Sequence, residues 1–141
     1  MNFKATRLAL LSLFVLSLTF SSCDPLRPIL MILEGDWDVT SFTEDGVEVM
    51  GTVFTSIQIE FEEYGETEGE TNWTFLGTNG ASTLVTGDYQ LNDDGSEVEI
   101  SFKSGSLTGE IVDFDLDLED DEMELAGNID GFRWVIDADK D

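Results

Sequence analysis

The side chains that could perform chemistry in this 141-residue chain are few in kind. The sequence holds no histidine and a single cysteine, Cys23. This composition excludes Ser-His-Asp and Cys-His arrangements and the commonest zinc ligand. Catalysis would depend on the 31 acidic residues, and no pair of them is singled out by the apolar setting that a carboxylic acid catalyst requires. We therefore expect a protein that is not an enzyme.

Cys23 follows a pattern typical of export. The apolar run 8–20 comes after the basic residues Lys4 and Arg7, and two serines separate it from the cysteine. The run is shorter than the roughly 20 residues that a membrane-spanning helix needs. The pattern predicts a secretory signal whose cleavage site lies directly before the thiol.

This segment resembles a bacterial lipoprotein signal, in which the cysteine is acylated and becomes the first residue of the mature protein. The resemblance implies that residues 1–22 are a signal peptide, that Cys23 is the lipid attachment site, and that acyl chains hold the protein at a membrane. The expected location is the bacterial cell envelope, on its periplasmic or cell-surface face. Residues 23–34 would be the anchor and tether, and residues 35–141 one folded domain.

The chain that remains after cleavage is strongly acidic. Without Lys4 and Arg7, four basic residues face 31 acidic ones, which is a formal net charge of −27. Such a surface repels nucleic acids and anionic head groups, so no nucleic-acid partner is expected. A cationic ligand, a metal ion or a basic partner remains compatible with this charge.

Three of the acidic residues are expected to form a row. A four-residue loop over 119–122 would pair Asp117 with Glu124, and the hairpin that follows would pair Glu124 with Asp137. Like charges directly opposite each other destabilise a sheet. Solvation and salt are the simplest relief, and a weak divalent-cation site, with calcium as the candidate ion, is the alternative hypothesis. No other cofactor is expected.

The acidic side chains are positioned by β-strands in which apolar and polar residues alternate. From residue 36 onward the apolar residues recur with a period of two, and turn signals divide the chain into about eight strands. Gly51 is expected to bend or bulge the second strand, and residues 111–112 to form a β-bulge. The apolar run 29–33 would form one helical turn or close an opening. The expected strands are 36–43, 47–62, 71–76, 82–91, 97–103, 107–118, 123–129 and 132–138.

Short turns between half-buried antiparallel strands predict an all-β fold, an eight-stranded antiparallel up-and-down barrel, with a two-sheet β-sandwich as the alternative. The last hairpin can be read residue by residue, because Asp130-Gly131 suits a type I′ turn. A glycine opposite an indole would leave room for the ring. The expected pairs are Ile129–Phe132, Gly127–Trp134 and Leu125–Ile136.

Gly35-x-Trp37 at the start of the first strand, together with Arg133 on the last, resembles the lipocalin-like barrels. The resemblance implies a cup that binds a small apolar molecule in its mouth, with an arginine near the first-strand indole. The hairpin register, however, places Arg133 on the face opposite Phe132 and Trp134. Its contact with Trp37 would therefore need a bulge or a position at the barrel rim.

The barrel interior is expected to be rich in aromatic side chains, and eight strands leave room either to fill it or to hold one small ligand. We expect non-catalytic binding of a small hydrophobic molecule. The alternative is a structural or protein-interaction module with a filled barrel and an acidic surface that weakly binds divalent cations. Tyr89 and Trp134 are favoured as ligand contacts because each carries a polar group. The candidate ligand-binding residues are Trp37, Trp73, Tyr89 and Trp134, and the expected interior also includes Phe61, Phe75, Phe102, Phe114 and Phe132.

Overall fold

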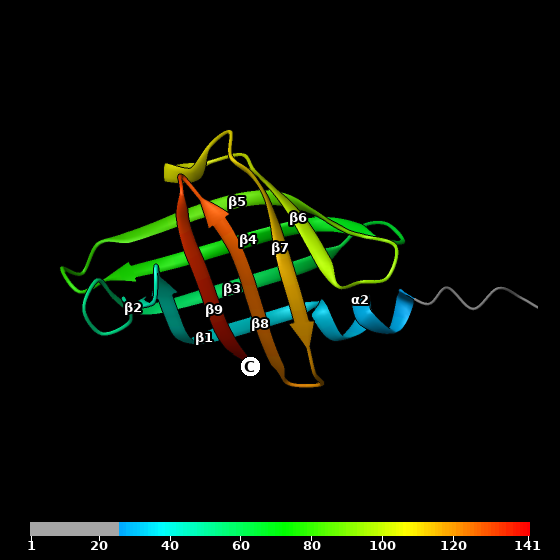
Figure 1. Cartoon of the computed structure of the whole chain (residues 1–141), viewed down its shortest axis with the longest axis horizontal. Coiled ribbons are helices and arrows are strands. Elements are labelled where there is room, and N and C mark those ends of the chain that lie inside the picture. The colour runs from blue at the N-terminus through cyan, green and yellow to red at the C-terminus, as the bar shows by residue number, and fades with distance from the viewer. Residues whose placement is uncertain (1–25) are drawn as a thin grey trace, which may run out of the picture.

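The computed structural model describes residues 26–141, which build one closed antiparallel sheet (Figure 1). The expected signal peptide, 1–22, and the acylation site Cys23 lie outside the described residues. The elements are α2 (Arg27–Leu33), β1 (Gly35–Glu44), β2 (Val47–Glu48), β3 (Phe54–Glu63), β4 (Glu68–Gly77), β5 (Ser82–Leu91), β6 (Glu97–Phe102), the 3-10 helix η2 (Gly105–Leu107), β7 (Ile111–Leu118), β8 (Glu122–Ile129) and β9 (Phe132–Lys140). Within this part of the chain, no helix is long and apolar enough to cross a membrane.

The order of the strands closes the sheet on itself. Across residues 26–141 the sheet has nine strands, and β1 pairs with β9 as well as with β3. The two-residue β2 pairs with β1 alone, so the other eight strands form the barrel. Closure leaves these strands without the free edges that an open sheet would expose. The predicted eight-stranded up-and-down barrel is confirmed, and the sandwich is wrong.

The two-residue periodicity decides which side chains enter the core. On β7, Val112 and Phe114 are buried, whereas Asp113 and Asp115 are exposed. The other long strands repeat this alternation, so that apolar side chains line the inside and carboxylates cover the outside. Burial of the apolar face is the main stabilising contribution to such a fold.

The two strand irregularities predicted at Gly51 and at residues 111–112 are not observed at those positions. Gly51 does not bend a continuous strand; it sits in the turn between β2 and β3 with φ of 76°. The β6–β7 register runs unbroken through residues 111–112, so the bulge predicted there is wrong. Ile111 is an apolar residue that faces outward and is 66% exposed. The observed register shifts fall between Val39 and Ser41 and between Phe54 and Ser56.

The last hairpin has the predicted register, with all three expected residue pairs in place. Asp130 and Gly131 both have positive φ, as a type I′ turn requires. Gly127 is opposite Trp134 as predicted, but the ring that comes nearest is a different one, because a Cβ at this position would lie 2.7 Å from Cδ1 of Phe114. Phe132 is also not an interior residue: it follows the turn directly and is 46% exposed.

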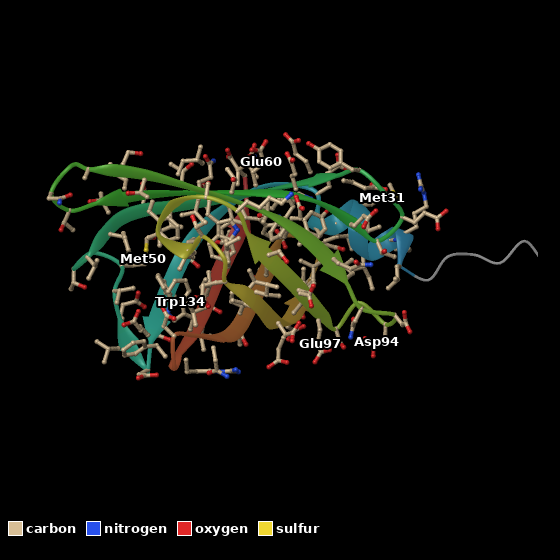
Figure 2. All side chains as sticks on the ribbon, turned by 90° about the horizontal axis from the view of Figure 1, so that it is seen from above. Met31, Met50, Glu60, Asp94, Glu97 and Trp134 are labelled. Atoms are coloured by element: carbon tan, nitrogen blue, oxygen red, sulfur yellow. The ribbon has the colours of Figure 1, made fainter. Side chains whose placement is uncertain are left out.

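The two ends of the barrel differ. At the end where β1 begins and β9 finishes, α2 buries Leu30 and Leu33 against the core, which confirms the predicted helical turn. At the other end lie the β2–β3 loop, η2 and the start of β9. Figure 2 shows Met31 of α2 at one end of the molecule, and Met50 and Trp134 at the other. The first end is closed by the helix, and the second is where an opening could form.

Candidate functional site

A pocket of about 330 Å³ opens at the end opposite α2. We call it the mouth pocket. The ends of β1 and β4, the starts of β3, β5 and β9, the β2–β3 loop and η2 all contribute to it. Its lining residues are Phe42, Glu44, Val49, Val53, Phe54, Phe75, Thr83, Ser106, Leu107 and Trp134.

Aromatic rings form a continuous series beneath the mouth pocket. The Phe42 ring centroid lies 4.9 Å from that of Trp134 in an edge-to-face arrangement and 6.2 Å from that of Phe54. Phe54 in turn contacts Phe75, and Phe75 contacts the fully buried Trp73. Such pairs are rigid and apolar. The pocket therefore has a preformed apolar floor.

Four polar side chains interrupt this apolar lining, and they are Glu44, Thr83, Ser106 and Trp134. Nε1 of Trp134 is buried and has no hydrogen-bond partner among the described residues. Glu44 is directly opposite Trp134 in the β1–β9 pairing, on the same face of the sheet, and is half-buried. The mouth pocket thus combines one unpaired donor with one carboxylate.

Glu48 holds the loop at the rim of this pocket. Its carboxylate accepts hydrogen bonds from the backbone N–H groups of Phe42 (3.0 Å) and Met50 (2.9 Å) and from Oγ of Ser41 (2.7 Å). The Phe42 bond first, and then the Ser41 and Met50 bonds, lower the pKa of Glu48 below its ordinary value. One side chain therefore fixes β1 and the loop leading to Val49 and Val53.

At the closed end, Trp37 is a plug rather than a ligand contact. It is fully buried, and its Nε1 donates to the carbonyl of Leu33 at 2.8 Å. The cation over its ring belongs to Lys140, whose Nζ lies 5.3 Å from the ring centroid. Arg133 instead points outward, with Nη2 3.4 Å from Asp115, as the hairpin register required. Lys140 was not predicted as the partner of Trp37. It nevertheless belongs to the same set of alternating, inward-facing residues of β9 as Trp134.

The other two candidate residues also lie away from the mouth pocket. Nε1 of Trp73 donates to Oγ1 of Thr71 at 2.9 Å, so this indole is satisfied within the core. Tyr89 is 1% exposed, lies toward the α2 end beside Phe61, and its hydroxyl has no partner among residues 26–141. Burial, with smaller effects of Glu63 and Glu34, raises the pKa of Tyr89 to about 12. Of the four predicted ligand residues, Trp134 lines the pocket.

The predicted acidic row is present on the outer face. Asp117 pairs with Glu124, and Glu124 pairs with Asp137. The same three residues line a surface hollow of about 260 Å³. No group of three or more carboxylates in the described part of the chain is arranged to hold a metal ion. The divalent-cation hypothesis stays a prediction.

Comparison with known proteins relates this chain to others through its fold. No family model and no curated protein matches it. A redesigned β-barrel is similar, with a TM-score of 0.62 and 17% identity over 86% of this chain and 98% of that one. Another, mFAP0 bound to DFHBI, has a TM-score of 0.56 and 15% identity over 77% and 99%.

A natural protein also has this fold. A lipocalin-like protein from Bacteroides uniformis is similar with a TM-score of 0.51 and 18% identity, over 74% of this chain and 96% of that one. At such identities the likeness extends to the fold alone. The chain therefore has a lipocalin-like β-barrel fold.

Proposed function

We propose that this barrel is a non-catalytic lipoprotein of the bacterial cell envelope that binds a small hydrophobic molecule in the mouth pocket. The observation that carries the proposal is a largely apolar pocket of about 330 Å³ at the barrel end opposite α2, which has Trp134, an indole with a buried and unpaired Nε1, among its lining residues. Pockets for small molecules usually measure about 300–1,000 Å³ and combine apolar walls with a few polar groups. This pocket lies at the small end of that range.

The packing of the barrel restricts the ligand to the mouth. Trp73 and Phe114, deeper in the barrel, are fully buried and contact each other. A ligand would therefore rest on the aromatic floor instead of entering the core. A similar redesigned barrel, mFAP0, is bound to the small molecule DFHBI, which supports small-molecule binding by this architecture.

The membrane anchor and the envelope location rest on the sequence. Acylation of Cys23 would place the domain beside a bilayer, because several acyl chains together anchor a protein stably. The tether from residue 23 to α2 ends at the closed end of the barrel, since α2 packs there. The mouth pocket would then be at the end farther from the anchored residue.

The test is titration of the mature chain, with Cys23→Ser so that no acyl chain competes, against diphenylhexatriene. This uncharged hydrocarbon fluoresces in apolar surroundings. We expect a saturable rise in fluorescence with the unaltered domain, and at least a tenfold loss of affinity in Val53→Asp, because a charge at the pocket rim opposes entry of a hydrocarbon.

Leu84→Asp is the matched control. Val53 and Leu84 are similarly exposed, at 50% and 55%, but Leu84 does not line the mouth pocket. The two substitutions therefore change charge and exposed apolar area alike. Equal affinity of both variants for diphenylhexatriene, or no saturable binding by the unaltered domain, would overturn the proposed function.

A further inference from the structure

We propose that the mouth pocket selects an uncharged apolar molecule that carries a hydroxyl group, and that it discriminates against the matching carboxylate. The inference rests on the proposed function and specifies the chemical class of its ligand. It depends on two residues of the lining, Trp134 and Glu44, which lie opposite each other on neighbouring strands.

The first requirement is a hydrogen-bond acceptor on the ligand. The chain has three tryptophans, all within the described residues, and two of them have partners: Trp37 donates to Leu33 and Trp73 to Thr71. Trp134 is the one whose buried Nε1 has no partner there. An indole N–H can only donate, and leaving it desolvated and unpaired is costly. A ligand oxygen that accepts from Nε1 would remove that cost.

The second requirement concerns charge. Glu44 faces Trp134 across the β1–β9 pair, and no lysine or arginine is among the residues that line the pocket. An anionic head group would therefore meet a carboxylate without a compensating cation, in a chain whose net charge is already −25. Like charges at such a site oppose binding.

A hydroxyl group meets both requirements at once. Its oxygen can accept from Nε1 of Trp134 while its hydrogen is donated to the carboxylate of Glu44. A carboxylate ligand offers only acceptors and adds a charge. An ammonium ligand offers only donors and leaves the Trp134 N–H unpaired. The remainder of the ligand must be apolar, because the pocket floor is formed by Phe42, Phe54 and Phe75.

The experiment compares decanol with decanoate, which share one alkyl length, as competitors that displace diphenylhexatriene from the mature Cys23→Ser chain. We expect decanol to bind at least tenfold more tightly than decanoate. Trp134→Phe keeps an aromatic ring beside Phe42 and removes the donor, so it should weaken decanol roughly fivefold more than it weakens the hydrocarbon probe, which is the effect of one net hydrogen bond.

Glu44→Gln supplies the second variant, which keeps the inference testable if Trp134→Phe unfolds. It removes the charge and should strengthen decanoate binding, so that the preference for decanol falls. If diphenylhexatriene binds but both competitors displace it equally, or decanoate binds more tightly, the inference fails while the proposed function stands. If diphenylhexatriene itself does not bind, the proposed function fails first.

Discussion

Nζ of Lys140, on the last strand, lies 5.3 Å from the centroid of the Trp37 ring on the first strand. The same ammonium donates to the carbonyl of Ile32 in α2 at 2.5 Å, and Trp37 donates to the carbonyl of Leu33 at 2.8 Å. Two side chains thus connect β1, β9 and the end of α2. This arrangement closes the end of the barrel that faces away from the mouth pocket.

Lys140→Met should destabilise the domain by about 1–2 kcal/mol, because it removes a cation–π contact and a charged hydrogen bond while keeping most of the apolar stem. Urea denaturation would measure the change. Lys103→Met is the control, since Lys103 pairs with Asp88 on the surface, where ion pairs contribute about 0–1 kcal/mol. Equal losses in the two variants would show that the Lys140–Trp37 contact has no special role.

The motif around Trp37 shows what sequence alone could predict. Gly-x-Trp indicated the fold, and the structure explains its glycine: Gly35 has φ of 122°, and a Cβ there would lie 3.2 Å from Cε of Lys140. The family resemblance implied Arg133 as the partner of Trp37, whereas the hairpin register placed Arg133 on the outer face, and the structure agrees with the register. Closure of β1 onto β9 includes a register shift between Val39 and Ser41, which a local pattern does not reveal.

Local hairpins were predictable, and long-range geometry was less so. The turn at Asp130-Gly131 and the loop 119–122 fixed the register of the last three strands, so the Asp117–Glu124–Asp137 row follows from the sequence. The mouth pocket brings together five strands, a loop and η2. The contribution of Trp134 was anticipated from its polar group, but that of Glu44 depends on the closing strand pair and was missed.

Tyr89→Phe should stabilise the domain by about 1 kcal/mol, because it removes a buried hydroxyl that has no partner among residues 26–141. Tyr64→Phe is the control: its hydroxyl is exposed and lies 2.9 Å from Glu62 and 3.0 Å from Glu70. Chemical denaturation at neutral pH measures both variants. A loss of stability in Tyr89→Phe would mean that the hydroxyl is satisfied in solution.

The raised pKa of Tyr89 predicts that the domain loses stability at alkaline pH. Burial raises the pKa of Tyr89 from 10 to about 12. A raised folded-state pKa means that the folded protein retains the proton longer than the unfolded chain. The stability contribution is therefore complete below pH 10 and is lost as the pH rises to about 12. Tyr64→Phe leaves Tyr89 as the remaining one of two tyrosines, so tyrosinate absorbance would report this titration directly.

Glu124→Lys should stabilise the domain by about 1 kcal/mol, since it converts two like-charge cross-strand pairs, with Asp117 and Asp137, into opposite-charge pairs. Asp93→Lys, in the β5–β6 turn, makes the same change in net charge outside the row and should have a smaller effect. Thermal unfolding at low salt compares the two variants. Equal stabilisation would assign the effect to net charge alone.

Calorimetric titration with calcium separates solvation of this row from cation binding. Heat, and a rise in melting temperature at millimolar calcium, are expected only if the row binds the ion. Both signals should then disappear in Glu124→Lys and persist in Asp93→Lys. Their absence in the unaltered domain would rule out the divalent-cation hypothesis.

Glu48→Ala should weaken binding of diphenylhexatriene about fivefold or more while the barrel stays folded. Glu48 bonds to Phe42, Met50 and Ser41, and so positions the loop that carries Val49 and Val53 at the pocket rim. Its strand β2 pairs with β1 alone and lies outside the closed ring. Loss of the carboxylate would therefore release the rim before the core, because local openings require only the contacts of the segment that moves.

The pH dependence of binding should follow the same carboxylate. Hydrogen bonds lower the pKa of Glu48 from its ordinary value of 4.5, so these bonds are fully present above that pH and are lost as the pH falls below it. Probe affinity should thus decline on acidification in the unaltered domain and stay flat in Glu48→Ala. Glu66→Ala, at an exposed position in the β3–β4 turn, should retain both the affinity and its decline. Glu48 and Glu66 lie at opposite ends of the barrel. An equal loss of probe affinity in Glu66→Ala would therefore show that the effect comes from surface charge in general.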